Sequence, residues 1–169
     1  MTYAETILPE FDQEIANTRK VLACVPDDNI DWRPHPKLNT IRWNANHLVE
    51  IVGWVEGTLT ETSWNVAPPE GPAYESPSLG TRAELLELFD RNVASARKAI
   101  EQVADDELAT PWSLLFGERL IFTMPRSEVI RTFILNHLIH HRAILCMDLR
   151  MVGVAVPGMY GPSGDESGL

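Results

Sequence analysis

Apolar residues recur every three to four positions in four segments of the chain, which is the spacing of one face of an α-helix. The first segment ends near VPDD at positions 25–28, and the second covers residues 40–60. The third opens at residues 81–84, and the fourth follows Pro125 and reaches about Arg150. Four amphipathic segments of this length predict an all-α protein folded as a four-helix bundle.

The third segment carries a start signal of its own. Thr81 precedes the apolar stripe, and Glu84 lies three residues later. In this arrangement the threonine side chain caps the first turn while the glutamate reaches back to the cap residue. The sequence therefore predicts that a helix begins directly after Thr81.

The connection between the second and third helices, TETSWNVAPPEGPAYESPSLG at positions 60–80, is long and rich in Pro, Ser and Gly. A helix of about 20 residues is about 30 Å long. An extended connection covers about 3.3 Å per residue and can cross that distance. We therefore expect a crossover that lets the third helix run parallel to the second, rather than a tight hairpin.

Two further segments do not follow helical spacing. Residues 112–124, WSLLFGERLIFTM, contain β-favouring stretches on both sides of Gly117 and predict a small β-hairpin before the fourth helix. Residues 153–169 are dense in Gly and Pro and predict a tail that cannot continue the helix. The whole chain, residues 1–169, is expected to form a single domain that includes this tail.

Composition narrows the classes of partner. The chain has 169 residues, 44% of them hydrophobic, and 24 acidic against 14 basic side chains give a formal net charge of -10. Such a surface repels phosphate backbones and anionic membranes, and no local basic patch offsets it, so neither nucleic acid nor a membrane is expected as a partner. Cys24 and Cys146 form no disulfide framework, and the N-terminal stretch lacks a secretory signal, so a cytoplasmic protein is expected.

Three histidines, His137, His140 and His141, lie in the strongly apolar stretch ILNHLIHHRAILCMDLR of the fourth segment. Residues four apart lie one turn apart on nearly the same helix face, and His137 and His141 have this relation on the inward stripe. His137 and His140 are three apart, so that pair also shares a face. Spacing favours the first pair mildly and leaves the second open.

A third inward-facing imidazole comes from His47 in WNANHLVEIVGW, near the middle of the second helix. Two imidazoles on one helix and one on a facing helix are a common donor set for a divalent metal, and three protein ligands leave a position open for water or substrate. The alternative is that each histidine is a hydrogen-bonded core residue, because buried polar groups need partners. His35, between two prolines, is expected in a loop.

Two stretches resemble the DinB-like proteins. One is DWRPHPKLNTIRWNANHLVEIVGW at residues 31–54, and the other is NHLIHHRAILCMDLRMVGVAVPGMYGPSGDE at residues 136–166. The resemblance implies a four-helix bundle of up-down-down-up topology. It also implies a divalent metal ion held by His47, His137 and His141, with His140 as a neighbour. Many relatives are dimeric, so a homodimer is expected.

The chain departs from these relatives at one place beside the histidines. Relatives often carry Gly-Gln after the His-Arg pair, where this chain has Ala143 and Ile144. The substitution makes the wall beside the site more apolar and removes any hydrogen bond that the amide would make to a ligand. Cys146 lies five residues after His141, on a different face, and is expected to pack in the core.

The resemblance also implies an activity. Some DinB-like proteins are thiol-dependent S-transferases or isomerases that use bacillithiol or mycothiol. We therefore expect a metal-dependent enzyme of the thiol S-transferase type that acts on a small electrophilic molecule. A metal-assisted hydrolase and a non-catalytic, stress-related metal-binding protein are the alternatives. Imidazole binds zinc, nickel, iron and manganese alike, and zinc or nickel is the ion we expect, with a low-molecular-weight thiol as co-substrate.

Several residues near the histidines have two possible roles that the sequence does not distinguish. Trp43 and Trp54 could line a pocket, although aromatic residues at helical spacing are more often core. Glu50 is a candidate fourth ligand or proton acceptor, although glutamates on such helices mostly face water. Arg142 could hold an anionic substrate, with a surface salt bridge as the simpler use. Tyr160 could fold over the site with the tail, as a lid.

Overall fold

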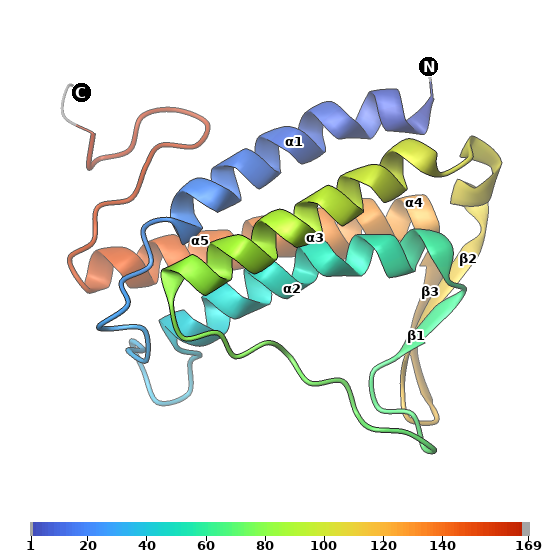
Figure 1. Ribbon diagram of the computed structural model, residues 1–169, viewed down its shortest axis with the longest axis horizontal. Helices are drawn as coiled ribbons and strands as arrows, with labels where there is room; N and C mark the ends of the chain where they lie inside the picture. Colours follow the sequence, from blue (N-terminus) through green and yellow to red (C-terminus); the bar gives the residue numbers. More distant parts are fainter. Residues whose placement is uncertain (1, 167–169) are drawn as a thin grey trace.

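The computed structural model describes residues 2–166, which form four long helices and a small three-stranded sheet (Figure 1). The first three long helices are α1 (Tyr3–Leu22), α2 (Ile41–Thr60) and α3 (Arg82–Gln102). In the fourth, three elements follow one another without a break: α4 (Arg126–Glu128), η2 (Val129–Leu135) and α5 (Asn136–Met151). The strands are β1 (Ser63–Asn65), β2 (Pro111–Phe116) and β3 (Arg119–Pro125), and the short helix η1 (Asp105–Ala109) precedes β2.

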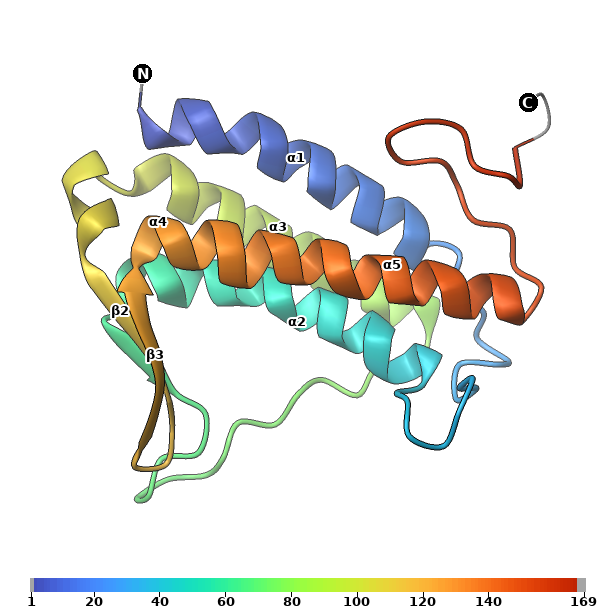
Figure 2. The ribbon, with the colours of Figure 1, turned by 180° about the vertical axis from the view of Figure 1, so that it is seen from behind.

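The long helices lie side by side with the sheet at one end (Figures 1 and 2). α2 and α3 both begin at the end far from the sheet and run toward it, whereas α1 and the fourth helix run the other way. α2 contacts α3 on one side and α5 on another, and α1 contacts both α3 and α5. The site described below lies where α2 faces α5.

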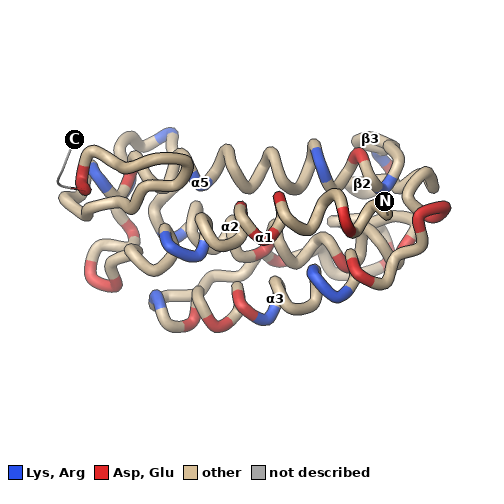
Figure 3. The backbone as a smooth tube through the Cα atoms, turned by 90° about the horizontal axis from the view of Figure 1, so that it is seen from above, with Lys and Arg blue, Asp and Glu red and all other residues tan. Residues whose placement is uncertain are grey.

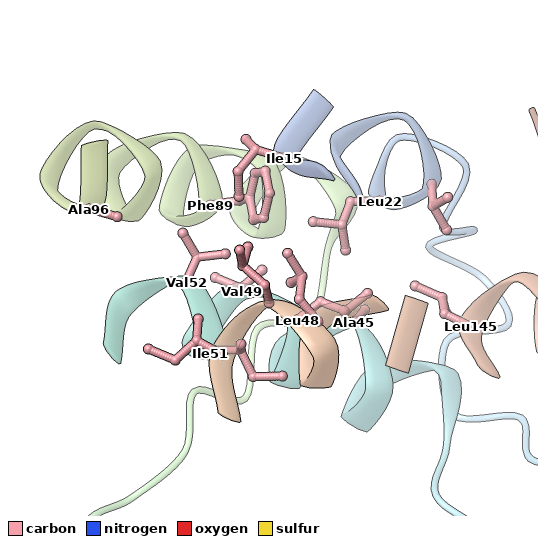
Figure 4. Close-up of a cluster of buried hydrophobic side chains, with 14 of the residues drawn as sticks. Ile15, Leu22, Ala45, Leu48, Val49, Ile51, Val52, Phe89, Ala96 and Leu145 are labelled. Carbon is pink, nitrogen blue, oxygen red and sulfur yellow. The ribbon is translucent and has the colours of Figure 1, made fainter. Parts of the chain in front are cut away.

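α2 supplies the centre of the hydrophobic core. Its residues Leu48, Val49 and Ile51 are fully buried, and they point in different directions around the helix (Figure 4). Because such a helix has apolar neighbours on several sides, it is buried over most of its circumference rather than along one stripe. The partners that Figure 4 labels come from the other three long helices: Ile15, Leu22, Phe89, Ala96 and Leu145.

Helix boundaries follow local capping chemistry. The predicted start of α3 is confirmed: the Thr81 hydroxyl accepts the backbone N–H of Glu84, and the Glu84 carboxylate accepts the backbone N–H of Thr81. Thr2 and Glu5 form the same reciprocal pair at the start of α1, whereas at the start of α2 the Thr40 hydroxyl alone accepts, from the backbone N–H of Trp43. α5 ends before Gly153, whose φ of 81° is a left-handed conformation that glycine adopts without strain.

The predicted hairpin is confirmed, and the sheet has one strand more than expected. β2 and β3 are antiparallel and turn at Gly117, with φ of 61°. β1, from the connection after α2, pairs parallel to β2, with Trp64 opposite Leu114. The expectation of an all-α protein with only a hairpin missed β1, because three residues are too few to show a strand pattern.

The connection between α2 and α3 runs from the sheet back along the outside of α2 to the start of α3 (Figure 1). The buried side chain of Asn46 attaches it to α2: its Oδ1 accepts the backbone N–H of Leu79 at 2.8 Å, and its Nδ2 donates to the Leu79 carbonyl at 3.1 Å. Two hydrogen bonds from one amide side chain hold the connection in the way a neighbouring strand would.

The tail beyond α5 turns back toward α1 (Figure 2). The Asp165 carboxylate accepts the backbone N–H of Val156 and the Nε–H of Arg150, which closes the tail into a loop. Residues 167–169 of the Gly/Pro-rich tail lie outside the described residues.

The basic residues do not gather into one patch, as the sequence analysis expects. Lysine and arginine positions are scattered over several elements rather than gathered on one face (Figure 3). Within residues 2–166, none of the helices has the length and apolar character that a membrane span requires.

Candidate metal centre

α2 and α5 bring His47, His137 and His141 together. The Nε2 atoms of His47 and His137 are 3.2 Å apart, and the ring centroids of His47 and His141 are 4.5 Å apart. One ring nitrogen from each of the three residues lies within 4.8 Å of the others. The predicted convergence of imidazoles from two helices is confirmed. His140 is exposed, and its ring contacts the His141 ring from outside the group.

The fourth helix changes its winding just before the histidines. Over η2 the backbone is π-helical, and the N–H of Asn136 donates to the carbonyl of Arg131, five residues earlier. A π-helical stretch shifts the direction in which all following side chains face, and such stretches are frequent at functional sites. The spacing of apolar residues, which predicts an ordinary helix here, contains no signal for it.

A buried carboxylate holds the ring of His47. Nδ1 of His47 lies 2.5 Å from Oε1 of Glu50, one turn later on α2, and the hydroxyl of Tyr74 donates to Oε2 at 2.9 Å. Glu50 is only 6% exposed, so the expectation that it faces water is wrong. A carboxylate on Nδ1 keeps the proton on that nitrogen and leaves the Nε2 lone pair free.

An amide holds the ring of His141 in a similar way. Nδ1 of His141 lies 3.3 Å from Oδ1 of Asn44, and Nδ2 of Asn44 donates to the Asp148 carboxylate at 3.0 Å. Asn44 and Asp148 are both buried, and burial raises the pKa of Asp148. Sequence analysis missed both residues, although each lies at helical spacing from a histidine: Asn44 three before His47, and Asp148 seven after His141.

Burial keeps two of the rings neutral. It lowers the pKa of His137 to about 4, and the neighbouring His47 and His140 add to this effect. It also lowers the pKa of His141 to about 4, with a further contribution from His47 and His137. Both rings are therefore uncharged at neutral pH, which is the state that binds a metal ion.

Aromatic side chains enclose the three rings. Trp43 stacks on His47, with ring centroids 4.5 Å apart, and is 39% exposed, so it is not a core residue. The Trp54 ring lies 5.7 Å from His47 and 5.8 Å from His137, and it also packs against the core. Phe133, from the π-helical stretch, lies 5.7 Å from His137. These rings give the histidines an apolar wall.

A cavity of about 490 Å³ begins next to this wall. Glu50 and Trp54 belong to both places, since they contact histidines and also line the cavity. The three histidines themselves are not part of its lining. A much smaller hollow of about 80 Å³ is lined by His141 together with Asn44 and Asp148. Among these spaces, only the larger is of a size that encloses a small molecule.

Comparison with known proteins decides the family. The model of the DinB superfamily matches residues 10–145, which is most of the chain. The chain belongs to the DinB superfamily. It is 24% identical over 163 residues to the uncharacterized protein YrdA of Bacillus subtilis, with 94% of this chain and 89% of YrdA covered.

Two solved structures of DinB-like proteins share the fold. One, from Bacillus cereus, has a TM-score of 0.71 and 23% identity, and the match covers 92% of this chain and 97% of that one. The other, YjoA from Bacillus subtilis, has a TM-score of 0.70 and 14% identity, covering 94% and 99%.

Two residues that sequence analysis placed at the surface or over the site of this DinB protein lie elsewhere. Arg142 is 1% exposed and donates to the buried carboxylate of Glu14 at 2.5 Å, so it is not a surface ion pair. The Tyr160 hydroxyl contacts the same carboxylate and the Arg142 guanidinium, so the tail does not cover the histidines. Arg142 directly follows His141, and successive helix residues point about 100° apart, here toward α1.

The cysteines lie outside the centre. Cys146 is buried in the core, as expected, and Cys24 is part-buried at the end of α1. Burial raises the pKa of both thiols. Neither sulfur belongs to the histidine group.

Proposed function

We propose that His47, His137 and His141 bind a divalent metal ion in this DinB protein. The observation that carries the proposal is the meeting of three ring nitrogens, from two helices, within 4.8 Å of one another. Without a cation, three imidazoles in such proximity are left with poorly matched nitrogen–nitrogen contacts, whereas one cation can accept a lone pair from each. Zinc or nickel is the ion we expect.

The surroundings of the histidines support the same assignment. Glu50 accepts from Nδ1 of His47, and Asn44 accepts from Nδ1 of His141, which directs both Nε2 atoms inward. Metal-binding histidines are held by such partners almost without exception. Within residues 2–166, no carboxylate or thiolate joins the three imidazoles as a fourth ligand. The arrangement therefore leaves a coordination position for a molecule from solution.

The reaction we assign to this centre is thiol S-transfer to a small electrophile. A divalent ion held by His47, His137 and His141 would lower the pKa of a thiol bound there toward neutrality. The thiol gives its proton to solvent water, its sulfur bonds to the electrophilic carbon, and the leaving group departs with the electrons of the bond that breaks. Cys24 and Cys146 are remote from the centre, so the thiol is a co-substrate of low molecular weight, such as bacillithiol or mycothiol.

Metal-assisted hydrolysis is the second candidate, because one observation favours it. A hydrolase needs a base beside the metal-bound water, and Glu50 lines the cavity next to the histidines. Both oxygens of Glu50 already accept hydrogen bonds, from His47 and Tyr74. A carboxylate occupied in this way positions its partners better than it accepts a proton, so we place thiol transfer first.

Metal content tests the binding proposal. We expect one equivalent of divalent metal in the wild type, measured by mass spectrometry of the purified protein, and a loss of most of it in His137→Ala. His140→Ala is the matched control, since His140 is a neighbour on the same helix outside the group. Equal metal content in wild type and His137→Ala, or loss in both variants, would contradict the assignment.

Consumption of an electrophile tests the reaction. We expect metal-loaded protein to accelerate the reaction of monochlorobimane with a low-molecular-weight thiol, and His137→Ala to show no acceleration. Thiol-independent hydrolysis of an activated ester by the same preparation would move the assignment to a hydrolase. A metal-loaded protein with neither activity would identify a binding protein without catalysis. The expected homodimer is tested separately, by sedimentation of the wild type.

A further inference from the structure

The cavity next to the histidines has aromatic walls on several sides. It lies between α2, α3, the strands β1 and β2, and the connection that crosses from the sheet to α3. Trp64 and Tyr74 meet edge to face with ring centroids 4.9 Å apart, and Trp54 lies 5.7 Å from Trp64. Trp112 completes the aromatic lining. A volume of about 490 Å³ with walls of this kind is typical of a small-molecule site.

The charges that face the cavity all have one sign. Its lining contains three carboxylates, Glu50, Glu61 and Glu75, and among the described residues no lysine, arginine or histidine lines it. The nearby Arg126 is engaged elsewhere, with the Glu107 carboxylate and the backbone carbonyl of Glu61. A cavity with this balance repels anions and attracts cations.

Gly57, in the last turn of α2, lines the cavity. A Cβ atom at this position would meet nothing within 4 Å, so no packing contact explains the absence of a side chain. Glycine in a helix costs about 1 kcal/mol relative to alanine. Gly53, one turn earlier, differs, because its Cβ would lie 3.1 Å from the Asn92 amide. Gly57 therefore borders open space in the cavity, and a longer side chain at this position would extend into it.

The wall of the cavity also holds an unused donor. Trp112 is 2% exposed, and its indole N–H has no hydrogen-bond partner among the described residues. An indole N–H only donates, so its partner would be an acceptor atom on the body of a ligand and not an ammonium group.

We propose that this cavity binds a small organic ammonium ion with an aromatic or aliphatic body. Aromatic faces and carboxylates together are the arrangement that recognises alkylammonium groups, through cation–π and ionic attraction. Tyr74 contributes to both parts, since its ring forms the wall and its hydroxyl donates to Glu50. The assignment of this cation as the molecule that reacts at the histidines rests on the proposed function, because Glu50 and Trp54 connect the two places.

Calorimetric titration of the EDTA-treated full chain tests the proposal without any metal. The probes are benzyltrimethylammonium, benzyl alcohol and phenylacetate, which share a ring and differ in charge. We expect the ammonium ion to bind at least about tenfold more tightly than the alcohol, and the carboxylate not to bind. Comparable affinity for the anion and the cation, or no binding of the cation, would overturn the proposal.

Variants connect the binding to this cavity. Gly57→Leu places a side chain in the empty space, and we expect it to abolish ammonium binding while the helical circular dichroism is unchanged. Glu61→Gln combined with Glu75→Gln should weaken the cation about tenfold and leave benzyl alcohol unaffected. Glu70→Gln, on the same connection but outside the lining, is the control. If the double glutamine variant binds the cation as the wild type does, the charge argument is wrong.

These results separate the two proposals. Ammonium binding by metal-free protein, together with a wild type that never takes up metal, would overturn the proposed function and leave the cavity assignment standing. Metal uptake without ammonium binding would do the opposite.

Discussion

Glu50 Oε1 lies 2.5 Å from Nδ1 of His47, and the other oxygen of the same carboxylate accepts a hydrogen bond from the Tyr74 hydroxyl. This one side chain thus joins the histidine centre on α2 to the connection that crosses outside it. Its position is set by the helix, since residues three apart lie on one face. Because Glu50 is buried and contacts His47, a substitution of Glu50 changes the surroundings of the His47 ring.

Glu50→Gln should weaken metal binding about 10- to 100-fold, because the amide keeps the size of the side chain but accepts more weakly from Nδ1 of His47. Competition with a chromogenic chelator measures the affinity. Glu56→Gln, an exposed position on the same helix, is the control. Equal affinity in wild type and Glu50→Gln would show that the contact does not support the metal.

Metal-free protein should lose stability as the pH falls from about 6.5 toward 4. Burial and neighbouring histidines lower the pKa of His137 and His141 to about 4 in the folded state, whereas unfolded histidine titrates near 6.5. Between these values the unfolded chain binds more protons, so the stabilisation is complete above 6.5 and is lost on acidification. Urea unfolding of EDTA-treated protein at several pH values measures it.

The variant His141→Asn isolates this effect. It removes one of the two buried imidazoles, so its stability should depend less steeply on pH in the same window. His35→Asn, in an exposed loop, should keep the wild-type slope. Identical slopes in all three proteins would mean that these rings titrate alike in the folded and unfolded states.

Arg142→Met should destabilise the fold by about 3 to 5 kcal/mol, because it leaves the Glu14 carboxylate buried without its partner. The two side chains are only 2% and 6% exposed, and the guanidinium also donates to Thr18. Arg150→Met, at an exposed ion pair with Asp165, should cost about 1 kcal/mol or less. Urea unfolding compares the two, and similar losses would contradict the special role of the buried pair.

Replacement of both cysteines by alanine should leave thiol-dependent activity unchanged. Burial raises the pKa of Cys24 and Cys146, and neither lies with the histidines, so neither supplies the reacting thiolate. Bimane assays with and without added thiol measure this. Activity that disappears in the double variant would show that the protein provides the sulfur itself.

Much of the fold was accessible from local sequence patterns. The start of α3 at Thr81 and the turn at Gly117 depend on residues close in the chain, and the structure has both. The strand β1 was missed because its partner β2 lies about 50 residues later, and three residues carry no pattern of their own.

In the candidate site, too, some features follow from local sequence and others depend on residues far apart in the chain. Helical spacing favoured His137 with His141 mildly and left His137 with His140 open, and the inward position of His47 made it a third member. The resemblance to DinB-like proteins implied that His140 is a neighbour. The holding residues Asn44 and Asp148 were not identified, because the former belongs to α2 and the latter to α5, and nothing local shows that they meet. The burial of Arg142 was also misjudged, since its partner Glu14 is 128 residues away.

From its sequence alone, this chain is determined to form amphipathic helices, with their caps and turns, and to place histidines on inward faces. These features depend on hydrogen bonds and side-chain spacing within a few residues, which neighbouring positions control. Only the tertiary structure decided which carboxylates are buried and where the π-helical stretch lies relative to His137. It also decided that the open space at Gly57 belongs to the same cavity as Trp54, which contacts the histidines. Those features arise where α2, α3, α5 and the sheet pack together, and packing depends on groups far apart in the chain.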